Sequence, residues 1–156
     1  MVNSNKVIIM ISNLGLAAVA QKKAELAIKE KRYDDAWRFY HEQAEYYDKH
    51  ICSGCYPYTD VQVRCLQSKV DEGFANILRL QGKHKQALVH MVFWIGSNFA
   101  VDRKTLSMTS KLKVYFNRCK FVDATLYDAQ KLIESFMLNT STSMFVTTSK
   151  LINTWQ

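Results

Sequence analysis

The residues best suited to chemistry lie in one short segment, residues 50–65, which reads HICSGCYPYTDVQVRC. Its histidine and three cysteines are His50, Cys52, Cys55 and Cys65, the nitrogen and sulfur donors that a structural zinc site uses. A gap of two residues lets the thiolates of Cys52 and Cys55 face the same tetrahedral ion. Because Cys65 does not belong to a second such pair, only half of the zinc pattern is present. We therefore interpret the four residues as ordinary loop or buried side chains, and predict no metal and no cofactor.

Catalytic signatures are missing from the sequence. Cys52 and Cys55 are spaced like a redox pair, but such a pair opens a helix beside a βαβ unit, and the sequence predicts no such unit. The chain contains no glycine-rich phosphate loop, no nucleophile elbow and no histidine pair with a glutamate at zinc-binding spacing. His41, His84 and His90 lie within helical patterns, where packing or solvent contact is their expected role. We predict that the protein is not an enzyme.

The composition indicates a single, mostly helical domain over residues 1–156. The chain is 48% hydrophobic and 22% charged, which provides enough apolar material for a core. With one proline and five glycines, long helices are favoured over a sandwich of short strands joined by turns. A formal charge of +7 favours acidic partners, whether nucleic acid, anionic lipid or an acidic protein surface.

The amino terminus imitates a secretory signal, because Lys6 precedes an apolar run at residues 7–11 and an Ala-Val-Ala triplet at residues 18–20. Ser12 interrupts the run, however, and an apolar helical face continues through the supposed cleavage site. No later segment approaches the roughly 18 consecutive apolar residues of a membrane span. We predict a soluble, cytoplasmic protein without a membrane partner, and regard a secreted or periplasmic protein as the less favoured alternative.

One short pattern occurs three times, as KRYDDAW at residues 31–37, GKHKQAL at 82–88 and CKFVDAT at 119–125. Apolar residues recur at steps of three and four on both sides of each copy, which predicts a helix, a tight turn and a second helix. Gly82 suits such a turn, because it adopts the left-handed backbone that ends a helix at little cost. The predicted hairpins cover residues 16–49, 62–97 and 105–138. A cysteine-containing insertion at 50–61 and a tail at 139–156 complete the chain.

The hairpins resemble the tetratricopeptide repeat family, in which a small residue of the first helix packs on an alanine twelve positions later in the second. The pairs here are Ala24 with Ala36 and Ala75 with Ala87. In that family an aromatic ring stands three positions before the alanine of the second helix. The residues at this position in the three copies here are Tyr33, His84 and Phe121. The resemblance covers roughly residues 16–137. It implies a right-handed α-solenoid of about three antiparallel hairpins, and the alternative all-α architecture is a compact helical bundle.

The third copy departs from the family pattern, with Leu112 in the place of the small residue. The three aligned alanines, Ala36, Ala87 and Ala124, lie 51 and 37 residues apart, against a family period of about 34. The copies are therefore divergent, with an insertion after the first.

The resemblance implies a protein-binding module, such as an adaptor or an inhibitor, whose inner surface is formed by the first helix of each hairpin. The expected inward side chains are Lys22, Glu25, Lys29, Lys69, Glu72, Asn76, Arg79, Lys113 and Asn117. This groove would be net basic and would suit an acidic protein or peptide. An alternative interface is an outward aromatic patch around Trp37 and Tyr40.

Two other functions stay open from the sequence. A nucleic-acid-binding helical protein would use lysines and arginines on phosphates and tyrosines on bases. Against it, the 21 basic residues are mixed with 14 acidic ones, and no run reaches five like charges. The other function is that of a small inhibitor, of the kind that mobile genetic elements encode, which occupies the surface of a host protein. The sequence predicts no oligomeric state.

Overall fold

The computed structural model describes residues 12–141 and 143–156, and within them all regular structure is helical. The elements are α1 (Asn13–Lys29), α2 (Tyr33–Cys52), α3 (Asp60–Gln67), the 3-10 turn η1 (Ser68–Val70), α4 (Asp71–Leu80), α5 (His84–Phe99), α6 (Leu106–Cys119), α7 (Leu126–Leu138) and α8 (Met144–Asn153). The prediction of an all-α protein is confirmed. The apolar run at residues 7–11 lies outside the described residues, and α1 passes through residues 18–20. Among the described helices, none is long and apolar enough to cross a membrane.

Side-chain caps explain where several helices begin. The hydroxyl of Ser12 accepts a hydrogen bond from the backbone N–H of Gly15 at the start of α1. Thr59 and Gln62 form a reciprocal capping box at the start of α3. Thr125 and Asp128 form another at α7. Each cap satisfies backbone N–H groups that have no partner within the helix.

The three turn segments each contain a residue with left-handed backbone: Lys31 at φ 59°, Gly82 at φ 76° and Lys120 at φ 53°. The first two turns have the same hydrogen bonding. In each, the residue after the left-handed one donates its backbone N–H to the carbonyl five residues earlier. These bonds run from Arg32 to Ala27 and from Lys83 to Leu78, both at 2.8 Å. The first two segments thus form the same turn, as their sequences predict.

Alanines lie at the closest helix crossings. Ala24 and Ala36 are fully buried where α1 packs on α2, and Ala75 and Ala87 are fully buried between α4 and α5. Both predicted pairs are therefore confirmed as buried crossing residues. Without a longer side chain at these positions, the two backbones of each hairpin come close together.

The third copy has a different register from the predicted one. Ala36 and Ala87 are each the fourth residue of their helix, and the fourth residue of α7 is Ala129, which is fully buried. Ala124, the alanine aligned from the sequence, lies in the turn before α7, and so does Phe121. The alignment at Ala124 is wrong by five residues, because the third turn is longer than the other two.

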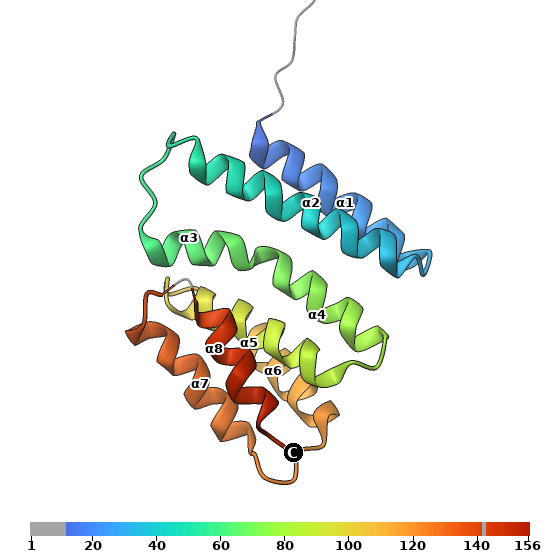
Figure 1. The fold of residues 1–156 in the computed structure, drawn as a ribbon, viewed down its shortest axis with the longest axis vertical. Helices are drawn as coiled ribbons and strands as arrows, with labels where there is room; N and C mark the ends of the chain where they lie inside the picture. Colours follow the sequence, from blue (N-terminus) through green and yellow to red (C-terminus); the bar gives the residue numbers. More distant parts are fainter. Residues whose placement is uncertain (1–11, 142) are drawn as a thin grey trace, which may run out of the picture.

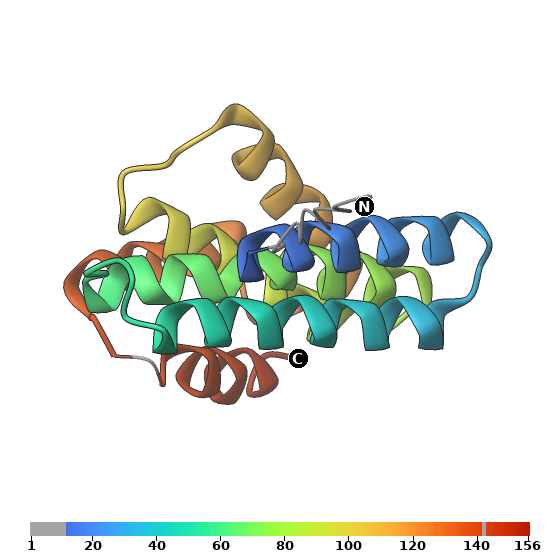
Figure 2. The ribbon, with the colours of Figure 1, turned by 90° about the horizontal axis from the view of Figure 1, so that it is seen from above.

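Helix α5 occupies the centre of the molecule and contacts α3, η1, α4, α6, α7 and α8 (Figure 1). Helices α6 and α7 each pack on α5 more extensively than on one another. Figure 2 shows α6 on one side of the molecule and α8 on the other. The choice between a short solenoid and a compact bundle stays open, since the α1–α2 and α4–α5 hairpins stack while α5 to α8 surround one helix.

The predicted tail forms a helix that belongs to the core. Met144 and Ile152 of α8 are buried in the apolar cluster around α5. A second apolar cluster lies between α1, α2 and α4, and the half-buried ring of Trp37 packs against both clusters. The two cores are therefore continuous at this residue.

Arg64 is fully buried, and no acidic side chain of the described residues pairs with it. The guanidinium of Arg64 in α3 donates hydrogen bonds to the carbonyl oxygens of Phe136 at 2.8 Å and Asn139 at 2.5 Å. These carbonyls lie at the carboxyl end of α7, which has no further helical turn to bond them. Burial lowers the pKa of Arg64. The side chain joins α3 to α7 and completes the end of that helix.

Candidate functional site

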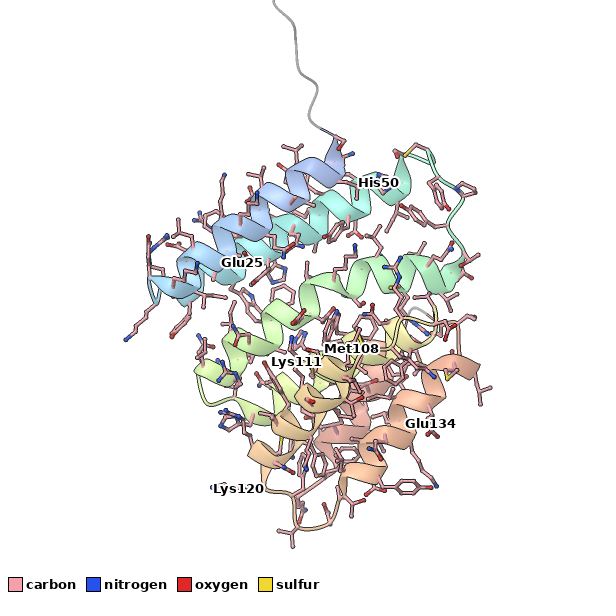
Figure 3. The ribbon with its side chains drawn as sticks, turned by 180° about the vertical axis from the view of Figure 1, so that it is seen from behind. Glu25, His50, Met108, Lys111, Lys120 and Glu134 are labelled. Carbon is pink, nitrogen blue, oxygen red and sulfur yellow. The ribbon has the colours of Figure 1, made fainter. Side chains whose placement is uncertain are left out.

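A groove of about 480 Å³ opens between α1, α2, α4 and α6, on the side of the molecule seen in Figure 3. Figure 3 labels Glu25 on α1 and Lys111 on α6, with α4 between these two helices. The groove is lined by Gln21, Glu25, Ile28, Lys29, Tyr40, Gln43, Lys69, Glu72, Gly73, Asn76, Met91, Lys111 and Tyr115. Its walls come from the helices that the repeat pattern places on the inner surface.

Several predicted site residues are brought together here. Lys29, Lys69 and Asn76 line the groove, as do the two expected glutamates, Glu25 and Glu72. Arg79 lies next to it on α4 and donates a 2.7 Å hydrogen bond to the side-chain oxygen of Asn76. Lys22 is exposed on α1 but is not among the lining residues.

The α6 wall is formed by residues that the sequence interpretation did not select. Lys111 and Tyr115 line the groove, whereas the predicted Lys113 and Asn117 are exposed outside it. Each of the latter lies two residues beyond a lining residue, which turns it about 200° around the helix. A signal was available in the sequence, because Lys111 stands four residues before the apolar-face residue Tyr115 and so shares its side of the helix.

Tyr40 forms the floor of the groove rather than part of an outward patch. Its side chain is only 7% exposed, and burial together with Glu25 and Glu72 raises its pKa to about 12. Trp37 is half-buried, with its ring 4.4 Å from that of Phe74. The expectation of an outward aromatic patch is therefore wrong for both rings. They turn inward because they fill the space between α2 and α4.

The wall between α4 and α6 is held by paired charges. Lys111 forms an ion pair with Glu72, and its Nζ lies 5.4 Å from the centre of the Trp94 ring. Burial raises the pKa of Tyr115, although the hydrogen bond from Arg79 opposes this rise. The charges of Lys111 and Arg79 are thus committed to contacts within the protein.

The unpaired charges lie at other positions of the groove. Lys29 and Lys69 are exposed, and within the described residues neither forms a salt bridge. Glu25 accepts a 3.0 Å hydrogen bond from the amide of Gln21. With three lysines and two glutamates in its lining, the groove is weakly basic. The excess positive charge available to a ligand comes from Lys29 and Lys69.

Gln43 adds a polar group to the floor. It is 1% exposed, and its Nε2 donates to the hydroxyl of Tyr47 at 2.9 Å. Its Oε1 is buried and has no hydrogen-bond partner in the described part of the chain. An unsatisfied acceptor of this kind costs free energy that a donor would recover.

The four residues predicted as alternative zinc ligands do not gather at one point. Sγ of Cys55 lies 3.8 Å from Nδ1 of His50, but Cys65 is buried in α3 with its thiol toward Asn98. Cys52 and Cys55 are both exposed. Among the residues that the structure describes, no group of three or more His, Cys, Asp or Glu side chains is arranged to hold a metal ion.

Comparisons of the chain with protein-family models, with curated proteins and with solved structures find no match. The resemblance to tetratricopeptide repeats therefore stays a prediction from the turn segments and the alanine pairs. The groove and its charges are the features that bear on function.

Proposed function

We propose that the protein is a non-catalytic binding module, an adaptor or inhibitor, that holds an acidic protein segment in the groove between α1, α4 and α6. This proposal rests on Lys29 and Lys69, which line the same groove from α1 and η1 and form no salt bridge with any described residue. Two cations beside a concave, partly apolar surface favour a ligand that brings carboxylates to them.

The rest of the lining suits a polypeptide. Ile28 offers apolar contact, while Gln21 and Asn76 carry amides that can pair with a peptide backbone. The ion pair of Lys111 with Glu72 holds α6 against α4, so the groove keeps its shape before the partner arrives. A preformed groove reduces the entropy that binding loses.

The experiment compares capture of partners from a lysate of the source cells by three forms of the protein. These are the wild type, the double variant Lys29→Glu/Lys69→Glu, and the control Lys113→Glu, whose residue lies outside the groove lining. We expect the double variant to lose its partner at unchanged melting temperature, because exposed charges contribute mainly to association. Binding that survives the double reversal would contradict the groove model.

Nucleic acid is the second candidate, and one observation favours it. On the exposed side of α2, Arg38 lies 5.1 Å from the ring centre of Phe39, and Lys49 lies 5.2 Å from that of Tyr46. Basic groups beside aromatic rings are typical of single-strand binding. Nuclease treatment of the lysate and oligonucleotide affinity measured across salt test this candidate, because phosphate contacts give a steep salt dependence.

A further inference from the structure

A second group of reactive side chains lies away from the groove, in the loop between α2 and α3. His50, labelled in Figure 3, is in the last turn of α2, and its Nδ1 lies 3.8 Å from Sγ of Cys55. On the other side of the ring, Nε2 lies 2.8 Å from the hydroxyl of Tyr58. The hydroxyl of Ser53 is 3.2 Å from the same sulfur. Cys55 is exposed, so a reagent can reach it.

The contact with Tyr58 suits the imidazole to the role of proton acceptor. When Nε2–H donates to the oxygen of Tyr58, Nδ1 carries a lone pair and faces the thiol. A thiol becomes a nucleophile only when its proton has left, and a neighbouring imidazole is a group that can take it. The loop therefore contains a nucleophile, a proton acceptor and a group that orients the acceptor.

We propose that Cys55 is a site of covalent modification by thiol–disulfide exchange, with His50 as the acceptor of its proton. The thiol proton passes to Nδ1 of His50, and the thiolate attacks one sulfur of a small-molecule disulfide, R–S–S–R. A bond forms between Sγ and that sulfur while the bond between the two sulfurs of the reagent breaks. The departing thiolate takes up the proton, so the products are a mixed disulfide at Cys55 and R–SH.

Cys52 is the second exposed thiol of this region. It is the last residue of α2, and Gly54 between the two cysteines has φ 66°, a left-handed turn that few other residues adopt without strain. Within the described residues, no imidazole contacts the thiol of Cys52, so Cys52 should react more slowly than Cys55.

The other two thiols provide a contrast within the same molecule. Cys65 is buried, and burial raises its pKa; burial also raises the pKa of Cys119, to about 11. Only a small fraction of each of these two thiols is ionised near neutral pH. Among the contacts of the described residues, neither has an imidazole beside it. Reaction should therefore be confined to the loop.

The experiment treats the folded protein with dithiobis-nitrobenzoate in less than stoichiometric amount, and locates the label by peptide mass spectrometry. We expect most of the label on Cys55. The fast labelling should be lost in Cys55→Ser and kept in Cys52→Ser. His50→Gln should slow the reaction of Cys55 by at least about tenfold, because it removes the proton acceptor. The matched control is His41→Gln, which removes an exposed imidazole of the same helix that contacts no cysteine among the described residues.

Two results would overturn the proposal. One is equal labelling of Cys52 and Cys55 in the wild type, which needs no variant and so does not depend on whether a variant folds. The other is a rate at Cys55 that is the same in His50→Gln and in the wild type, with helix content unchanged by circular dichroism. Neither result bears on the groove, because no residue of this loop lines it.

Discussion

The phenol ring of Tyr40 lies against the backbone of α4 at Gly73, where a Cβ atom would be 2.3 Å from Cζ of the ring. No real pair of carbon atoms approaches so closely without a bond, so the absence of a side chain at Gly73 is what allows α2 to pack on α4. The same contact places the tyrosine hydroxyl near Glu25 and Glu72, and so shapes the floor of the groove.

Gly73→Ala should therefore destabilise the protein by about 1–3 kcal/mol, because the added methyl group displaces a buried ring. Chemical denaturation measures this loss. A Tyr40→Leu substitution in the Gly73→Ala background should recover part of it, and a double-mutant cycle isolates the coupling between the two positions. Equal effects of Gly73→Ala with and without the tyrosine would contradict the contact.

The crossing of α4 and α5 at Ala87 gives a second prediction. Ala87→Leu should lower the free energy of unfolding by about 1–3 kcal/mol, since no space for three more carbons exists at a fully buried alanine. Ala18→Leu is the matched control, because Ala18 is exposed on α1. If both variants melt like the wild type, Ala87 is not at a close crossing.

Arg64 should matter to stability although it forms no ion pair within the part of the chain that the structure describes. Arg64→Met removes the charge-assisted hydrogen bonds to the carboxyl end of α7 and leaves the carbonyls of Phe136 and Asn139 without these donors, at a cost of about 2–4 kcal/mol. Arg118→Met, at an exposed position of α6, is the control for loss of an arginine. A neutral result for Arg64→Met would mean that burying the guanidinium costs as much as its hydrogen bonds contribute.

Asp71 predicts a dependence of stability on pH. Burial raises its pKa above the ordinary value of 3.8, and a 2.6 Å contact with Nδ1 of His90 opposes that rise in part. An acid with a raised pKa in the folded state binds its proton more tightly there than in the unfolded chain. Its contribution to folding is therefore largest below pH 3.8 and is lost as the pH rises through the folded-state pKa.

Asp71→Asn keeps an oxygen for His90 but cannot ionise. Relative to the wild type, this variant should gain stability as the pH rises from 3.8, which denaturation at a series of pH values measures. Asp102→Asn is the control: the residue is exposed, and asparagine tolerates its left-handed backbone of φ 61°. A difference between Asp71→Asn and wild type that does not change with pH would contradict the raised pKa.

The sequence was sufficient for the helical class and for the first two hairpins, because their signals are local. A left-handed residue at Lys31 or Gly82 and an alanine five positions later define the turn and the crossing without any knowledge of the rest of the chain. In the third copy, the alanine of the same short pattern is Ala124, which lies in a longer turn rather than in the second helix. Only contact with α5 shows that Ala129 has the equivalent role.

The site was harder to predict, because the direction in which each helix turns its polar side chains depends on the helices that it packs against. Lys113 and Asn117 are as polar as Lys111 and lie on the same helix. They point away from the groove because α6 is rotated so that its Leu112, Tyr115 and Phe116 are buried. The segment that forms α8 is rich in serine and threonine, and its apolar residues do not recur regularly enough to predict a helix. Its burial is set by α5, which no short-range pattern reveals.

The central position of α5 has a consequence for synthesis of the chain. Helices α1 and α2 pack most extensively on one another and can pair as soon as both have been made. The apolar cluster around α5, by contrast, includes Met144 and Ile152 of α8, the last helix to be made. Until these residues leave the ribosome, a nascent chain carries exposed apolar faces that favour aggregation. Chains that stop before residue 144 should therefore accumulate as insoluble material rather than as smaller folded proteins.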